Sequence, residues 1–289
     1  MNIVTTPDSV LQIATAAMAR TPDERLRTVM AALTRHLHAF VQEVRLSEDE
    51  FEQALEFIVG VGQATGEKKN EVVLAADLLG VSTLVALLNN QDPQGGESPA
   101  ALLGPFWRAN APLCTAGESI ARSKTPGVPL DVRGVVRDTE GRPLAGAIVD
   151  AWQASPVGLY ENQDPEQDDM NLRGRFETDA EGRYHFRTVR PAGYPVPTDG
   201  PCGVLLRAQQ RHPNRPAHLH FMVSKPGHKV LISQVFADDD ENLESDPVFG
   251  VTRRLIGCFE PQGDGQQATL QYDFVLEPGE MKFPRPPIP

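Results

Sequence analysis

Two histidines stand two residues apart in the segment PAHLHF, residues 216–221, which has the composition of a strand. Because side chains along a strand alternate between its two faces, His218 and His220 point to the same side. Neighbouring imidazoles are a common beginning of a transition-metal site. A solvated strand face also accommodates two polar residues, so this spacing alone leaves a metal site and an ordinary polar surface both open.

Two of the four tyrosines stand in loops or turns before this segment. Tyr160 stands at the start of a long polar loop, and Tyr194 lies in the rigid turn PAGYPVP. A free tyrosine titrates at about pH 10, so it binds as phenolate at neutral pH only to a strong, hard Lewis acid such as Fe(III). Cys114, Cys202 and Cys258 are far apart and fit no zinc or redox motif. Either tyrosine taken alone is better explained as a packed phenol.

The order of the motifs along the chain favours a metal site over a polar surface and packed phenols. The chain contains Gly-Leu-Tyr at 158–160, and the segments RGRF at 173–176, YPVPTDGP at 194–201 and RPAHLHF at 215–221. In this order they closely resemble the intradiol ring-cleavage dioxygenases. HLHAF at 36–40, DLLGVS at 77–82 and GPF at 104–106 are similar to the catechol 1,2-dioxygenase branch, and most to its hydroxyquinol 1,2-dioxygenases. The resemblance covers nearly the whole chain.

The resemblance implies a ligand set and two further active-site residues. Tyr160, Tyr194, His218 and His220 would bind one non-haem Fe(III) per subunit, and Tyr194 would also leave the metal and accept a proton from the substrate. Arg215 matches the guanidinium that the family places beside the substrate, where its permanent charge stabilises developing negative charge. Gln234 matches the second polar residue, whose neutral amide orients rather than titrates.

The resemblance also indicates the walls of the substrate pocket. They are Leu74, Asp77, Leu102, Leu103, Gly104, Pro105, Phe106, Val196, Pro197 and Val248. Asp77 is informative because a carboxylate there could accept a hydrogen bond from a third ring hydroxyl, although it could also be a surface or capping carboxylate. We expect O2-dependent cleavage of hydroxyquinol (benzene-1,2,4-triol) to maleylacetate (3-hydroxy-cis,cis-muconate).

Two alternatives stay open. Catechol or a chlorocatechol would give a cis,cis-muconate by the same reaction. A non-catalytic protein that binds iron or an aromatic compound could use the same four ligands, but it would not need Arg215 and Gln234.

The N-terminal part must supply helices, because only two of the 25 prolines lie before residue 93. Apolar residues recur every three or four positions through residues 26–44, the pattern of one helix face. Capping boxes are predicted at residues 21–24 and 47–50, the second opening another helix. A third helix is expected over residues 71–88, buried because it is apolar on most sides. By the resemblance, the apolar stripes at residues 10–44 would form a homodimer contact and could hold a phospholipid.

From residue 130 the period changes to the alternation of strands. Strand-like segments on either side of a Thr-Glu-Gly turn are expected over residues 130–153, with further strands at 182–189, 203–208, 217–224, 230–236 and 268–276. Short strands separated by Gly and Pro turns are typical of a β-sandwich. We therefore predict an α+β chain with an N-terminal α-helical dimerisation and linker domain at residues 1–98. A mainly antiparallel β-sandwich catalytic domain would occupy residues 99–289.

Composition excludes several other classes. The formal net charge is −12 at pH 7, which argues against a nucleic-acid or anionic membrane surface. No run of about 18 apolar residues exists, and the N-terminus lacks the basic and apolar regions of a signal peptide. We expect a cytoplasmic enzyme whose partners are a small aromatic diol, O2 and a second copy of itself.

Overall fold

The computed structural model describes residues 3–67, 69–90 and 96–288. The chain divides into two compact units, Met1–Val59 and Gly60–Pro289. The predicted boundary between a helical and a strand-rich domain after residue 98 stays a prediction.

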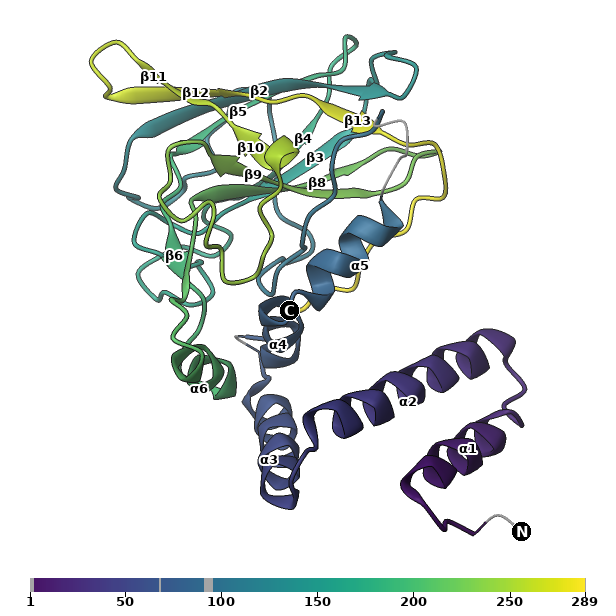
Figure 1. Ribbon diagram of the computed structural model, residues 1–289. Coiled ribbons are helices and arrows are strands. Elements are labelled where there is room, and N and C mark those ends of the chain that lie inside the picture. The colour runs from purple at the N-terminus through teal and green to yellow at the C-terminus, as the bar shows by residue number, and fades with distance from the viewer. Residues whose placement is uncertain (1–2, 68, 91–95, 289) are drawn as a thin grey trace. The chain divides into compact units, whose positions relative to one another are not determined.

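The first unit is helical (Figure 1). It contains α1 (Pro7–Met18), α2 (Glu24–Val44) and most of α3 (Glu48–Ala64). The capping box at Ser47 is present: the Glu50 carboxylate accepts from the Ser47 N–H at 2.9 Å, and the Ser47 hydroxyl accepts from the Glu50 N–H at 3.3 Å. At the start of α2 the cap differs from the prediction, because Asp23 is the N-cap and accepts from the Leu26 N–H.

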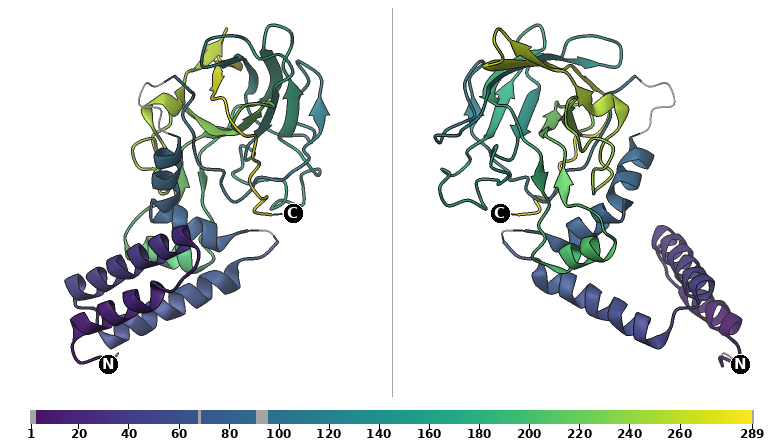
Figure 2. Two further views of the ribbon diagram at one scale, coloured as in Figure 1. Left: turned by 90° about the vertical axis from the view of Figure 1, so that its right-hand side faces the viewer. Right: turned by 60° about the vertical axis from the view of Figure 1, so that its left-hand side comes forward.

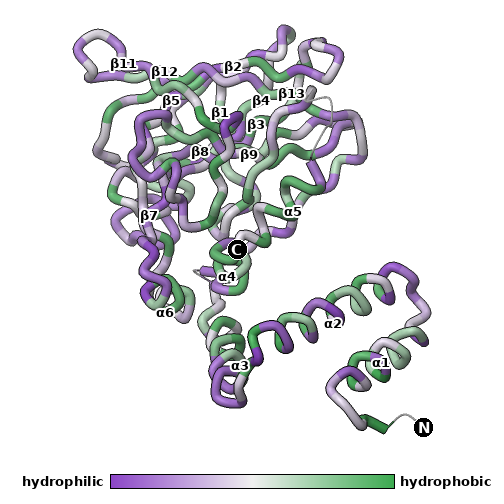
Figure 3. The backbone as a smooth tube through the Cα atoms, in the orientation of Figure 1, coloured by the Kyte–Doolittle hydropathy of each residue, from purple (hydrophilic) through white to green (hydrophobic). Residues whose placement is uncertain are grey.

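The apolar stripe of α2 faces solvent in the single chain. Leu33, Leu37 and Phe40 are 47%, 53% and 51% exposed, and α1 and α2 contain no buried residue. Figure 3 shows hydrophobic and hydrophilic positions alternating along α2. The predicted periodicity is therefore real, but the first unit does not bury the surface that it creates.

The helix expected over residues 71–88 is broken. It forms α4 (Glu71–Leu78) and α5 (Val81–Asn89), because Gly80 adopts φ +70° between them. α4 buries Glu71, Leu74, Asp77 and Leu78, whereas α5 has no buried residue, so the prediction of one buried helix is wrong for its second half. In the described part of the chain no single helix is long and apolar enough to cross a membrane. α4 and α5 pass that test only as a pair bent by 78°.

The second unit is built on two facing sheets, which confirms the β-sandwich (Figures 1 and 2). The six-stranded sheet has the order β1 (Leu113–Cys114), β4 (Arg173–Glu177), β3 (Ile148–Trp152), β8 (His218–Ser224), β9 (Leu231–Ala237), β10 (Ile256–Gly257). The five-stranded sheet has the order β11 (Phe259–Gln262), β12 (Gln267–Gln271), β2 (Pro129–Asp138), β13 (Phe274–Leu276), and β5 (Arg183–Val189) also pairs with β2. β6 (Tyr194–Pro195) and β7 (Asn214–Arg215) form a separate ribbon.

The strand pairing is mixed, with an apolar core between the sheets. Strands β3, β8 and β9 form an antiparallel centre, while β12 and β13 pair with β2 in parallel. The core contains Phe186 and Phe274 from one sheet and Phe221 from the other, each 0% exposed. At about 25 cal/mol per Å² of buried apolar surface, side chains of this size are the main stabilising contribution of the sandwich.

Two predicted strands differ from the structure. Residues 203–208 belong to the helix α6 (Pro201–Ala208), not to a strand. Pro201 occupies the first turn of α6, where its missing N–H costs nothing, and the buried Glu71 carboxylate accepts from the Cys202 N–H at 3.0 Å. The segment 268–276 is divided between β12 and β13. A short 3-10 helix, η1 (Arg253–Leu255), precedes β10.

Candidate functional site

The two histidines of β8 point to the same face of the strand and are buried. His218 and His220 are each 2% exposed, and their Nε2 atoms lie 3.1 Å apart. The alternate residues Leu219 and Phe221 enter the core between the sheets. The interpretation of His218 and His220 as a solvated polar surface is therefore wrong.

Two tyrosines bring their hydroxyl groups to the same place. Tyr160, in the loop after β3, and Tyr194, in β6, are 1% and 5% exposed. Their hydroxyl oxygens are 3.0 Å apart, and the Tyr194 oxygen lies 3.5 Å from Nε2 of His218. Four donor atoms from three separate segments thus converge in one buried spot.

The protonation states of the histidines suit metal binding. Burial lowers the pKa of His218 to about 3 and lowers that of His220 well below its ordinary value, so both imidazoles are neutral. Nδ1 of His218 lies 2.7 Å from the carbonyl oxygen of Pro216. In the neutral ring the proton is then on Nδ1, which donates a hydrogen bond to that oxygen. The lone pair of Nε2 is left free to bind a metal.

The phenols need a strong cation to ionise here. Burial raises the pKa of both Tyr160 and Tyr194 above the ordinary value of tyrosine. Among the described residues no group of three His, Cys, Asp or Glu side chains could hold a metal. The donor set available is therefore two neutral nitrogens and two phenol oxygens, which fits a hard, highly charged ion such as Fe(III).

Arg215 lies beside these donors and is held on several sides. It is 4% exposed, its Nε donates to Asp246 at 3.1 Å, and its Nη2 donates to Gln234 at 3.1 Å. Nη1 lies 3.1 Å from Nε2 of His218. Burial lowers the pKa of Arg215, but Asp246, Tyr194 and Tyr160 together raise it above the ordinary value of arginine, so the guanidinium stays charged. Arg215 is therefore a fixed cation at the site.

Gln234 and Asp246 hold this cation in place. The Gln234 amide also donates to the carbonyl oxygen of Leu102 at 2.6 Å, which ties β9 to the segment before Gly104. Although burial raises the pKa of Asp246, its pairing with Arg215 lowers it overall. Asp246 was not among the predicted site residues, because it stands in an acidic stretch with no spacing motif to distinguish it.

The predicted pocket residues surround two neighbouring cavities. Nine of the ten line one small cavity with Tyr194 and Arg215, namely Leu74, Asp77, Leu102, Gly104, Pro105, Phe106, Val196, Pro197 and Val248. Leu103 lines a larger cavity of about 690 Å³, which also includes Asp77, Leu102 and Gly104. The shared residues show that the two cavities are adjacent.

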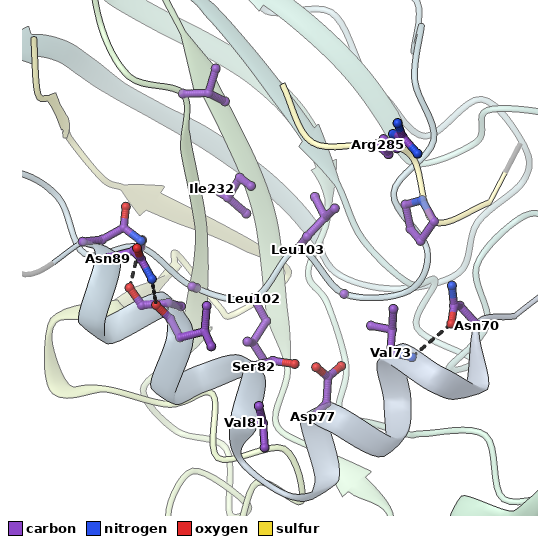
Figure 4. A pocket seen from close by; sticks show the side chains of 18 of the residues that line it. Asn70, Val73, Asp77, Val81, Ser82, Asn89, Leu102, Leu103, Ile232 and Arg285 are labelled. Atoms are coloured by element: carbon purple, nitrogen blue, oxygen red, sulfur yellow. Dashed lines mark hydrogen bonds between the residues drawn. The ribbon is translucent and has the colours of Figure 1, made fainter. Parts of the chain in front are cut away.

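Asp77 is a buried carboxylate in these cavities, not a surface or capping group. It is 4% exposed, and Figure 4 shows it beside Ser82 and Leu102. Burial raises the pKa of Asp77 to about 6, with Ser82 and the charge of Arg215 acting in the opposite direction. A polar substrate group that donates a hydrogen bond would relieve part of this desolvation cost.

Aromatic neighbours and one glycine fix the donors. Trp152 stacks on His220 with ring centroids 4.8 Å apart, and Phe106 stacks on Tyr160 at 4.6 Å. Gly104 adopts φ +75°, and a Cβ there would lie 3.2 Å from Cε1 of His220. The backbone can approach the imidazole this closely only because residue 104 has no side chain.

Comparisons with known proteins agree with this geometry. Residues 102–278 match a family model described as dioxygenase, and residues 23–97 match one described as catechol dioxygenase N terminus. A 6-chlorohydroxyquinol 1,2-dioxygenase from Cupriavidus pinatubonensis is 43% identical over 91% of this chain and 94% of its own. A hydroxyquinol 1,2-dioxygenase from a Rhizobium species is 42% identical over 90% of this chain and 92% of its own. The solved structure of hydroxyquinol 1,2-dioxygenase from Pseudomonas putida gives a TM-score of 0.86 at 38% identity, covering 94% of this chain and 99% of that chain.

Proposed function

Since the chain belongs to the intradiol ring-cleavage dioxygenase family, we propose that it uses O2 to open the ring of hydroxyquinol between two adjacent hydroxylated carbons. The product is maleylacetate, the tautomer of 3-hydroxy-cis,cis-muconate. The observation that carries this choice of ring is the buried carboxylate of Asp77 in the cavity that contains Tyr194 and Arg215. Hydroxyquinol 1,2-dioxygenases among the relatives support it.

In this proposal Tyr160, Tyr194, His218 and His220 hold one Fe(III) per subunit. The convergence of their four donor atoms and the neutral state of both imidazoles support that assignment. When bound, Fe(III) acts as a Lewis acid that acidifies the ring hydroxyls and activates the ring toward O2.

The surrounding side chains move a proton and stabilise charge. The phenol oxygen of Tyr194 lines the cavity and can hold a proton released by a ring hydroxyl, because its burial favours the neutral form. The guanidinium of Arg215 lines the same cavity and stabilises negative charge that develops on the substrate. Asp246 and Gln234 keep that guanidinium in one orientation. A protein that only bound iron would have no use for this buried cation.

The choice of ring is tested by substitution of Asp77. We expect Asp77→Asn to lower the rate on hydroxyquinol relative to catechol by about 10- to 100-fold, since a hydrogen bond to a charged group is worth about 1.5–3 kcal/mol. Oxygen uptake with hydroxyquinol, catechol and 4-chlorocatechol measures the ratio. Asp138→Asn, which changes a buried carboxylate of β2 outside these cavities, is the control and leaves the ratio unchanged.

The outcomes separate the alternatives. An unchanged ratio in Asp77→Asn would contradict the role of Asp77, and a wild-type preference for catechol or chlorocatechol would keep the reaction and replace the substrate. If the iron-replete protein took up no oxygen with any of the three diols, the protein would be a non-catalytic binding protein.

We also propose that the protein is a homodimer through its N-terminal helices. The exposed stripe of α2, which includes Leu37 and Phe40, is an apolar surface that a second copy would cover. We expect Leu37→Asp with Phe40→Asp to convert a dimer to a monomer in sedimentation velocity at micromolar concentration, with exposed Arg35→Asp as the control for added charge. A wild-type monomer would refute this part of the proposal. Lipid extraction and mass spectrometry of the dimer test for a bound phospholipid.

A further inference from the structure

The outer face of the six-stranded sheet carries a second polar group next to the row that contains His220. Trp152 of β3 pairs with Arg173 of β4 and with His220 of β8. Two residues away along β3, Asp150 pairs with Arg175 and with Met222. Residues two apart on a strand point to the same face, so this second row shares the face of the candidate metal site.

A cavity of about 360 Å³ lies on the second row. Asp150, Arg175, Met222 and Ser224 contribute side chains from the sheet. Trp107 lines it from the segment before β1, and Phe283 and Pro284 line it from the C-terminal tail. None of these residues lines the cavity that contains Tyr194 and Arg215. Pro286 lines both this cavity and the larger cavity that Leu103 lines. A volume near 300–1,000 Å³ is typical of small-molecule sites.

Asp150 is the polar centre of this cavity. Its side chain is buried, the residue being 6% exposed, and Oδ2 accepts from Nε1 of Trp107 at 3.2 Å. No other residue in the described ranges hydrogen-bonds this carboxyl, which therefore has acceptor capacity left in a desolvated place. Burial raises the pKa of Asp150 to about 7, with Trp107 and Arg175 acting against it. A partner that donates a hydrogen bond would offset this cost.

Arg175 balances the charge beside it. Its Nε donates to the carbonyl oxygen of Ala111 at 2.6 Å, and within the described chain its terminal nitrogens have no acceptor. The Asp150 carboxylate would repel an anionic ligand, and the Arg175 guanidinium would repel a cationic ligand. A neutral group that both donates and accepts satisfies the two together, and a hydroxyl does so with one atom.

The remaining walls are suited to a ring. Trp107 and Phe283 present aromatic surface, and Met222 presents a flexible thioether that packs well against aromatic groups. We propose that this cavity is a second binding site, for a neutral single-ring phenol whose hydroxyl donates to Asp150 and accepts from Arg175. This inference rests on the cavity and not on the proposed ring-cleavage reaction.

The test measures phenol binding while the metal site is filled. Anaerobic holoenzyme saturated with catechol is titrated with 4-fluorophenol, and binding is followed by 19F NMR. We expect one saturable equivalent per chain in addition to the catechol. Ala109→Phe, which places a ring inside the cavity, should abolish it, and Asp150→Asn should weaken it by at least tenfold.

A matched control separates the site from general effects. Asp131→Asn changes a carboxylate in a different cavity, where Asp131 pairs with His185 at 2.8 Å, and it should bind 4-fluorophenol as the wild type does. No saturable binding beyond the catechol, or equal affinity in Asp150→Asn and wild type, would overturn the inference. Tighter binding of 4-fluorobenzoate or 4-fluorobenzylamine than of 4-fluorophenol would also overturn it, because the site would then select a charge.

Discussion

The two faces of β8 are similarly buried but carry side chains of different chemical character. On the inner face Leu219, Phe221 and Val223 are 0% exposed and belong to the apolar core between the sheets. On the outer face His218 and His220 are almost as buried, yet they meet phenols, a guanidinium and an indole. One seven-residue strand thus supports the core with one set of side chains and presents chemistry with the other.

The difference shows where stability and function are separated in this molecule. Apolar burial on the inner face stabilises the fold in proportion to the area removed from water. Polar burial on the outer face costs free energy unless each group finds a partner. His220 is an example of this cost, since its Nδ1 is buried and has no hydrogen-bond partner among the described residues.

The largest expected effect comes from the outer face. His220→Leu removes a proposed metal donor but keeps an apolar side chain of similar size. We expect iron content and oxygen uptake to fall by at least about 100-fold, because even changes behind a ligand cost 10- to 100-fold. The unfolding free energy of the iron-free protein should stay within about 1 kcal/mol of wild type. Full iron occupancy in this variant would mean that the ligand assignment is wrong.

The inner face should give the opposite result. Phe221→Ala leaves a void between the sheets and should lower the unfolding free energy by about 3–5 kcal/mol in urea denaturation. Oxygen uptake per folded molecule should change little at a temperature where the variant is folded. A large loss of activity without a loss of stability would break the distinction between the two faces.

The Asp150 carboxyl gives a pH-dependent version of the same comparison. Its pKa is raised from an ordinary value of 3.8 to about 7, so the folded state favours the protonated form. The cost of ionising it is absent below pH 4, grows between pH 4 and 7, and is complete above pH 7. Asp150→Asn should therefore be more stable than wild type at pH 8, by up to about 4 kcal/mol, and similar to it near pH 4.

Denaturation of both proteins at pH 4, 6 and 8 measures this difference. Asp131→Asn serves again as the control, because Asp131 is partly exposed and paired with His185. A difference between Asp150→Asn and wild type that is constant with pH would show that Asp150 does not titrate in the folded state.

Local patterns predicted β8 and β9, but not β6 and β7, which carry Tyr194 and Arg215, and not the helices around the site as they form. The alternation in PAHLHF predicted that His218 and His220 share a face, and β8 confirms it. The apolar residues of 71–88 predicted one buried helix, but Gly80 in a left-handed conformation divides it and leaves Leu88 67% exposed. The strand expected at 203–208 is a helix, because its N-terminus is capped by Glu71 from a distant segment. Helix and strand propensities depend on neighbouring residues in the sequence, whereas this cap comes from a distant segment.

The site was predictable only as far as its motifs extend. Tyr160, Tyr194, Arg215 and Gln234 were found through a resemblance, since neither tyrosine taken alone indicates a metal. Asp246 and Trp152 carry no motif, although one pairs with Arg215 and the other stacks on His220. Their roles come from contacts that span tens of residues in the chain.

The sequence by itself determined the alternation that aims two imidazoles to one side of a strand, the helical period of the N-terminal unit and the family. The tertiary structure decided which buried groups meet: two hydroxyl oxygens 3.0 Å apart, a guanidinium fixed by Asp246, and the Asp77 and Asp150 carboxyls in different cavities. The physical reason is that periodicity follows from covalent geometry along the chain. Burial depends on segments that only folding brings together. The pKa shifts and the convergence of the donor atoms depend on them too.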